Sequence, residues 1–165
     1  MMELLNKKKI LILTLALLFL LPIAKVEAVM VELSLEQLTR DADLILVGKV
    51  ESVTSQMTDG KIFSLATISV ESKIKGELEP EQSIIVVSFP GGKVGDIGMK
   101  VEDSPNYQKD EEVVVFLKKM QGESHFFTVG SSQGKFIIDQ GVVLRENLPL
   151  EQFISRVKSL MEAGP

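Results

Sequence analysis

Apolar and polar residues alternate along most of the chain, and a period of two is typical of β-strands. The clearest run covers residues 66–75, where four apolar side chains are predicted on one face: Ala66, Ile68, Val70 and Ile74. Polar or charged residues occupy the other face of this run. One dry and one wet face are typical of an antiparallel sheet, so the pattern predicts a mainly β protein.

The first predicted strand covers residues 44–53, and its opening residues 44–47 are apolar on both faces. Gly48 interrupts this strand, which is typical of a bulge or bend. Asp59-Gly60 favours a tight hairpin before the second strand. The later apolar runs predict strands over residues 83–89, 99–101, 112–117, 125–129, 134–139 and 142–144.

A capping-box pattern precedes the first strand. Ser34 is followed three residues later by Gln37, which predicts a short helix over Leu35–Asp41. Together with the strands, this helix suits one domain over residues 29–165. We expect a single antiparallel Greek-key barrel of five to six strands, similar to an OB fold.

A C-terminal amphipathic helix is predicted over residues 149–163. Pro149 stands where a helix starts, with Asn147 or Leu148 as its cap. The apolar stripe of this helix follows the i, i+3, i+4 spacing: Leu150, Phe153, Ile154, Val157, Leu160 and Met161. Such a stripe is most often packed against a core, and a partner-binding face is the alternative.

Residues 1–28 have the three parts of a secretory signal peptide. Three lysines at positions 7–9 precede an apolar run over Ile10–Ala24, which is shorter than the ~20 residues of a membrane-spanning helix. Val26 and Ala28 then supply small residues at the −3 and −1 positions of a cut after Ala28. The sequence therefore predicts a secreted or extracytoplasmic protein. If the segment stays uncleaved, it anchors the chain and is its membrane contact.

Composition narrows the function classes. The 165 residues are 45% hydrophobic and 25% charged, which is a globular mixture. The net charge of −5 makes the protein acidic and argues against a nucleic-acid partner. The chain is cysteine-free, so disulfides, thiolate metal sites and a thiol nucleophile are excluded.

The longest irregular stretch, Pro90–Asp110, is the predicted functional segment, because long loops on a rigid scaffold often carry function. Its glycines match no phosphate-binding motif, so we interpret them as turn residues. We expect Gly91, Gly92 and Lys93 to shape the entry of a ligand- or partner-binding loop, with Tyr107 as a flat contact surface. The alternative is that Tyr107 packs inward and staples the loop to the sheet.

The candidates for catalysis and metal binding are weak. His125, the only histidine, would have to act with Ser131 or Ser132, and no G-x-S-x-G elbow surrounds either serine. Six carboxylates cluster in sequence between positions 96 and 112, in no known calcium-loop spacing: Asp96, Glu102, Asp103, Asp110, Glu111 and Glu112. We assign no catalytic residue, no metal ligand and no cofactor.

Five sets of residues stand out, in this order along the chain: 42–50, 70–76, 90–92, 104–107 with 111–117, and 133–136. In this order they resemble a group of uncharacterised secreted prokaryotic proteins. The Ala-Asp start, the bent first strand and the Lys-Gly after the second strand are also distantly similar to netrin-type modules, which include the tissue inhibitors of metalloproteinases. That resemblance implies an OB-like five-stranded barrel. The inhibitors act through an N-terminal cysteine, which this chain lacks, so no inhibitory residue is transferred.

The sequence thus predicts an exported, non-enzymatic binding or inhibitor-like module for an unknown extracytoplasmic protein or ligand. A hydrolase of unrecognised type, using His125 or the acidic loop, is one alternative. A calcium-stabilised structural domain of the cell envelope is another. An enzyme would need His125 to meet a serine or carboxylate, and a calcium site would need several carboxylates to converge.

Overall fold

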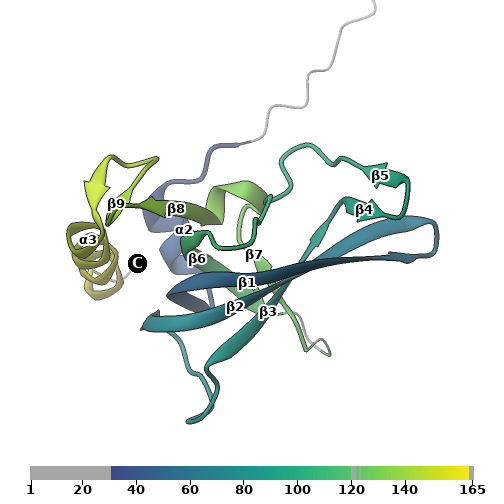
Figure 1. Ribbon diagram of the computed structural model, residues 1–165. Helices are drawn as coiled ribbons and strands as arrows, with labels where there is room; N and C mark the ends of the chain where they lie inside the picture. Colours follow the sequence, from purple (N-terminus) through teal and green to yellow (C-terminus); the bar gives the residue numbers. More distant parts are fainter. Residues whose placement is uncertain (1–30, 120–121, 123, 164–165) are drawn as a thin grey trace, which may run out of the picture. The chain divides into compact units, whose positions relative to one another are not determined.

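The computed structural model describes residues 31–119, 122 and 124–163, and it is mainly β (Figure 1). The signal peptide predicted for residues 1–28 lies outside the described residues. All elements named below belong to one compact unit, Glu32–Pro165. In chain order they are α2 (Leu35–Asp41), β1 (Leu44–Thr58), β2 (Lys61–Lys75), β3 (Ile84–Pro90), β4 (Gly92–Val94), β5 (Ile97–Met99), β6 (Glu112–Lys119), β7 (Phe126–Thr128), the 3-10 helix η1 (Ser131–Gly134), β8 (Lys135–Asp139), β9 (Val142–Val143), β10 (Leu148–Pro149) and α3 (Leu150–Glu162).

Eight strands form one sheet in the order β1-β2-β3-β7-β6-β8-β9-β10, and β4 and β5 form a separate hairpin. β1 also pairs with β6, so the pairings from β1 through β2, β3, β7 and β6 return to β1. The junction of β3 and β7 is parallel and consists of one residue pair, Val87 with Phe126. The sheet therefore has more strands than the five to six predicted, and it is not antiparallel throughout. The additional strands join the sheet through β6, because β6 pairs with β8 along residues 112–115 and with β7 along residues 117–119.

Two hydrophobic cores lie on opposite faces of β1 and β6. Leu44 and Leu46 face the first core, whereas Ile45 and Val47 face the second. This arrangement explains why residues 44–47 are apolar on both faces of the strand. The first core comprises Leu44, Leu46, Val50, Ala66, Ile68, Ile85, Val87, Phe89, Tyr107, Val113, Val115, Leu117 and Phe126. The second comprises Leu38, Ala42, Ile45, Val47, Val114, Phe116, Val129, Phe136, Ile138, Val143, Phe153 and Val157.

β1 and β2 form a long hairpin whose register shifts at three places. One shift lies between Val47 and Gly48, which confirms the predicted irregularity at this glycine. A Cβ at Gly48 would overlap the Ser69 carbonyl oxygen, so a larger residue does not fit there. Ile74 was predicted on the face of Ile68, but it packs against the second core. The reason is the register shift between Val47 and Gly48, where Glu71 is the extra residue of β2, because one inserted residue moves the side chains that follow it to the other face.

The hairpin turn lies at Asp59-Gly60, as predicted. Both residues have positive φ values, 50° and 74°, which a two-residue hairpin of the I′ type requires. The pairing continues without interruption to Thr58 and Lys61, so β1 extends five residues beyond the predicted end at Val53.

Helix α2 has the predicted bounds. The Ser34 hydroxyl accepts from the Gln37 backbone N–H at 3.1 Å, and the Gln37 side chain accepts from the Ser34 N–H at 2.8 Å, which completes the capping box. At its other end, the ammonium of Lys75 donates to the carbonyls of Thr39, Arg40 and Ala42, at 2.7, 3.1 and 2.6 Å. Lys75 therefore ties the end of β2 to the C-terminus of α2, where a positive charge is favourable.

Helix α3 packs its stripe against the second core. Phe153 and Val157 are fully buried, and the Phe153 ring lies 4.9 Å from that of Phe136. The predicted cap at Asn147 or Leu148 is wrong: Pro149 is the N-cap residue. Leu148 and Pro149 form strand β10 with β9, so the chain stays extended until Leu150.

Candidate functional site

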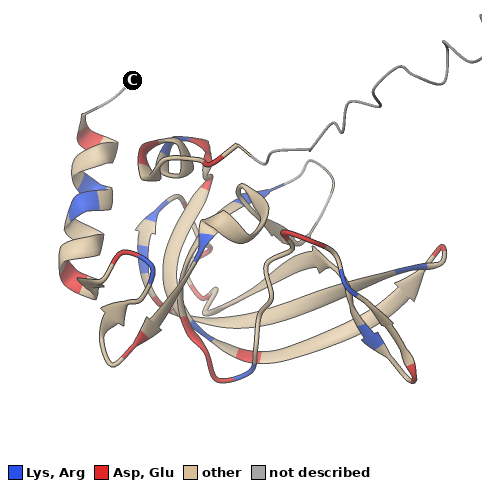
Figure 2. Cartoon of the chain, turned by 90° about the horizontal axis from the view of Figure 1, so that it is seen from above, with Lys and Arg blue, Asp and Glu red and all other residues tan. Residues whose placement is uncertain are grey.

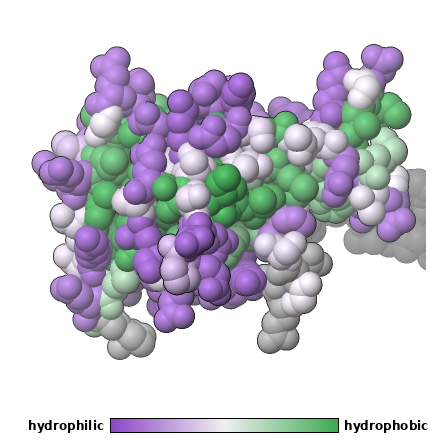
Figure 3. Space-filling view, turned by 60° about the horizontal axis from the view of Figure 1, so that its bottom comes forward, coloured by the Kyte–Doolittle hydropathy of each residue, from purple (hydrophilic) through white to green (hydrophobic). Residues whose placement is uncertain are grey.

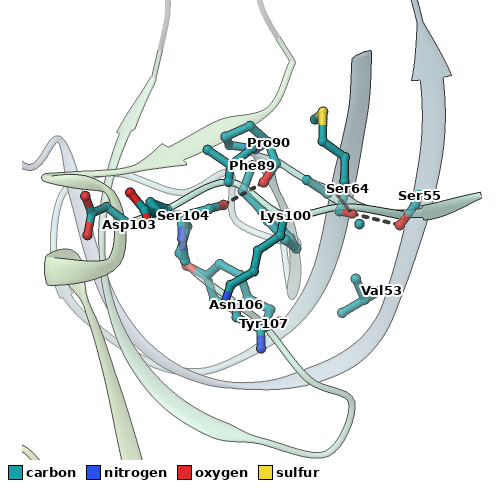
Figure 4. Close-up of a pocket in the computed structure, with 16 residues that line it drawn as sticks. Val53, Ser55, Ser64, Phe89, Pro90, Lys100, Asp103, Ser104, Asn106 and Tyr107 are labelled. Atoms are coloured by element: carbon teal, nitrogen blue, oxygen red, sulfur yellow. Dashed lines mark hydrogen bonds between the residues drawn. The ribbon is translucent and has the colours of Figure 1, made fainter. Parts of the chain in front are cut away.

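A pocket of about 670 Å³ lies between the long hairpin and the Pro90–Asp110 loop. Figure 4 shows the loop residues on one side and the side chains of Val53, Ser55 and Ser64 on the other. Loop residues therefore supply most of the wall. The complete lining is Val53, Ser55, Ser64, Phe89, Pro90, Gly91, Gly92, Met99, Lys100, Val101, Glu102, Asp103, Ser104, Pro105, Asn106 and Tyr107.

The loop begins with a small hairpin of β4 and β5, in which Gly92 pairs with Met99. The strand predicted at residues 99–101 therefore lies earlier, at Ile97–Met99. After the hairpin, the Ser104 hydroxyl donates to the Pro90 carbonyl at 2.6 Å. The Ser132 N–H also donates to the Asp103 carbonyl at 2.9 Å. The loop is thus bonded to the rest of the fold at several points.

Gly91 and Gly92 line the pocket where β3 passes into the loop. Gly92 has a φ of 129°, which side-chain-bearing residues rarely adopt, and a Cβ there would overlap the hydroxyls of Ser55 and Ser64. Those two hydroxyls lie 2.8 Å apart, and Ser64 donates to the Gly91 carbonyl at 2.6 Å. The glycines therefore let the loop backbone approach the long hairpin closely.

Lys93, the third predicted entry residue, is not part of the pocket lining. Its backbone N–H donates to the Ser55 hydroxyl at 3.3 Å, and the residue is exposed. The structure thus brings together three of the four predicted residues, with Tyr107 joining Gly91 and Gly92.

Tyr107 is 3% exposed and belongs to the first core. Its hydroxyl lies 2.8 Å from the Thr128 hydroxyl, and its ring lies 5.4 Å from the Phe89 ring. Burial raises the pKa of the Tyr107 phenol above its ordinary value, the Thr128 bond opposes this, and the charge of Glu111 adds to it. These contacts are those of a staple between the loop and the sheet, which was the alternative to a contact surface.

A largely buried ion pair also contacts this loop. The Lys135 ammonium lies 2.6 Å from a Glu111 carboxylate oxygen, and the two side chains are 6% and 16% exposed. Lys135 also donates to the Asn106 carbonyl and lies 4.9 Å from the Tyr107 ring centroid. Burial lowers the pKa of Lys135, and Glu111 opposes that shift. The sequence gave no signal for this pair, because position 135 alternates with apolar residues as any outward strand residue does.

Half of the polar side chains that line the pocket are already bonded inside the protein: those of Ser55, Ser64, Ser104 and Tyr107. The three serine hydroxyls hold backbone or each other, and in the described part of the chain no buried side-chain nitrogen or oxygen lacks a partner. Lys100, Glu102, Asp103 and Asn106 are exposed at the pocket wall, and the floor is formed by apolar groups such as Val53 and Phe89. The pocket thus combines an apolar floor with a few free polar groups.

The structure does not bring His125 into a hydrogen bond with either of the serines predicted as its possible catalytic partners. His125 precedes β7, and Ser131 and Ser132 follow that strand; among the described residues, no hydrogen bond joins His125 to either serine. The acidic residues do not converge either, since residues 31–119, 122 and 124–163 contain no group of three carboxylate or histidine side chains suited to a metal. Glu111 instead pairs with Lys135, and Asp110 lies 3.4 Å from Lys49.

Charged residues lie mainly at turns and strand ends, and long stretches of β1 and β2 carry none (Figure 2). The outward face of β2 and β3 is also rich in apolar side chains, because Phe63, Leu65 and Val86 alternate with buried core residues. Ile84, at 52% exposure, extends this face. Figure 3 shows hydrophobic residues forming a band across the side that it views. This outer face is the main competitor of the pocket as a binding surface.

No protein-family model and no curated protein matches the chain. Within the described residues, no helix is long and apolar enough to cross a membrane.

Proposed function

We propose that the protein is an exported, non-enzymatic binding module, and that its ligand binds in the pocket beside the Pro90–Asp110 loop. The basic, apolar and small-residue pattern of residues 1–28 supports export. The ring of pairings that returns to β1 supports an OB-like barrel as the scaffold. The partner is an extracytoplasmic ligand rather than a nucleic acid, because the chain is acidic.

The observation that carries this proposal is a pocket whose walls are held in place by bonds within the protein. Its volume, about 670 Å³, lies within the roughly 300–1,000 Å³ of small-molecule sites. Ser104, Asp103 and Tyr107 each bond the loop to another element, so little ordering is needed when a ligand arrives. A hydrolase is the weaker alternative, since His125 has no nucleophile bonded to it in the described residues.

Thermal denaturation in the presence of a small-molecule library tests the binding function. A ligand that binds the folded state raises the melting temperature, and the rise grows with ligand concentration. Val53→Phe narrows the pocket from the hairpin side, so it should abolish the rise for pocket ligands. Ile84→Ser on the outer face is the matched control and should leave the rise intact. Hits that survive Val53→Phe but disappear in Ile84→Ser would move the binding site to the outer face.

Mass spectrometry of protein recovered outside the cytoplasm tests export. We expect a mature N-terminus at Val29. Recovery of an intact Met1 would instead indicate an anchored chain, and recovery only from the cytoplasm would contradict export.

A further inference from the structure

The free polar groups of the pocket indicate the charge of its ligand. Ser55, Ser64 and Ser104 are occupied by bonds within the protein, so they do not offer a ligand free hydroxyl protons. The remaining donors in the wall are the Lys100 ammonium and the Asn106 amide, both exposed. In the described part of the chain, Lys100 has no ion-pair partner. A donor pair with one positive charge suits one anionic acceptor group.

Two acidic residues, Glu102 and Asp103, also line the pocket, and both are exposed. Figure 4 shows the Asp103 carboxylate at the margin of the lining residues, directed away from Lys100, whose side chain extends toward Asn106 and Tyr107 in this view. The Asp103 backbone is also fixed by its bond from Ser132. Lys100 is the one cationic residue of the lining, and in this view its ammonium points away from the Asp103 carboxylate.

The apolar residues of the pocket floor indicate the chemical character of the ligand's body. Val53, Met99 and Val101 are partly exposed and present carbon surface to the pocket, whereas Phe89 and Tyr107 are only 6% and 3% exposed. Apolar surface of this kind binds a hydrocarbon or aromatic body by excluding water from both.

We propose that the pocket binds an amphipathic ligand with an apolar body and one anionic head group, such as a carboxylate. The body lies against Val53, Met99 and Val101, above the buried rings of Phe89 and Tyr107, and the head group meets Lys100 and Asn106. This inference rests on the proposed function, because it names the ligand class of the same pocket.

The chain supplies its own probe for the test. Tyr107 is the only tyrosine and there is no tryptophan, so the tyrosine emission of the protein comes from the pocket floor. Emission is titrated with octanoate, octyltrimethylammonium and octyl glucoside, all below their micelle concentrations. The three probes share one tail and differ in charge, so only the head group varies.

We expect a saturable change in Tyr107 emission at lower concentrations of octanoate than of either other probe. Lys100→Met should weaken octanoate binding about fivefold and leave octyl glucoside unchanged, because an exposed charge contact is worth roughly 1 kcal/mol. Lys93→Met is the matched control, since Lys93 is a loop lysine outside the lining, and it should leave all three affinities unchanged. Added salt should weaken octanoate alone.

The outcomes separate the two proposals. Equal affinities for octanoate and octyl glucoside, or tighter binding of the cation, would overturn the anionic ligand class and leave the pocket as a binding site. Equal losses in Lys100→Met and Lys93→Met would also overturn it, because they would reflect the overall charge. No saturable change with any probe, together with no library ligand that Val53→Phe abolishes, would overturn both.

Discussion

The hydroxyl of Tyr107 lies 2.8 Å from that of Thr128, so the C-terminal part of the long loop is bonded to strand β7. The tyrosine ring at the same time packs on Phe89 in the first core. The loop that shapes the pocket is therefore fixed by the same core that holds the sheet together.

Tyr107→Ala should lower the free energy of unfolding by about 3–5 kcal/mol, the usual loss for truncating a buried aromatic residue. Tyr107→Phe keeps the ring and removes only the hydroxyl, so about 1 kcal/mol should be lost. Urea denaturation followed by circular dichroism measures both. A Tyr107→Ala variant as stable as the native protein would show that the tyrosine is a contact residue and no staple.

Tyr107 should ionise only at a pH well above 10.0, the ordinary value for a tyrosine, because burial raises the pKa of its phenol. Its neutral form is favoured in the folded state, so its contribution to stability is complete below pH 10 and is lost as pH rises through the folded-state pKa. Ultraviolet difference spectra at rising pH record phenolate formation. An ordinary titration curve in the folded protein would contradict the burial of Tyr107.

Glu111→Gln should destabilise the protein by about 3 kcal/mol, because it leaves the buried Lys135 ammonium without its counter-charge. Asp110→Asn is the matched control: Asp110 pairs with Lys49, but the two side chains are 68% and 40% exposed. Its effect should remain within about 0.5 kcal/mol, as for most exposed ion pairs. Similar losses in both variants, measured by thermal or urea denaturation, would argue against a special role for Lys135.

Lys75→Met should destabilise the fold by about 1–3 kcal/mol, because three carbonyls at the end of α2 lose a charged donor. Lys73→Met, two residues earlier on an exposed position, should change stability by no more than about 0.5 kcal/mol. Hydrogen exchange of the α2 amides gives a local measure of the same effect. Unchanged protection of α2 in Lys75→Met would contradict the capping role.

The sequence predicted those parts of the fold that depend on neighbouring residues. Ser34 and Gln37 form a capping box through contacts three residues apart, so the bounds of α2 were predictable. The turn at Asp59-Gly60 follows from the backbone freedom of two residues. Prediction was wrong where distant strands decide the outcome. The face of Ile74 depends on a bulge set by pairing with β1, and the N-cap of α3 depends on the pairing of Leu148 with Val143.

The candidate site divides in the same way. Gly91, Gly92 and Tyr107 were predicted from the loop itself, because glycines and a single tyrosine stand out in a long irregular segment. Lys100 and Asn106 were not singled out, since nothing near them in the sequence tells that they face Val53 across the pocket. Lys135 lies 24 positions from Glu111, so their pairing follows from the tertiary fold.

The most direct test of the account is the change in backbone amide NMR shifts when each of the three octyl probes is added. Binding in the pocket predicts shift changes at residues 53–55, 64, 89–92 and 99–107 with octanoate, largest near Lys100. Changes confined to the outward residues of β2 and β3, around Leu65 and Val86, or no changes in the pocket with any of the probes, would contradict it.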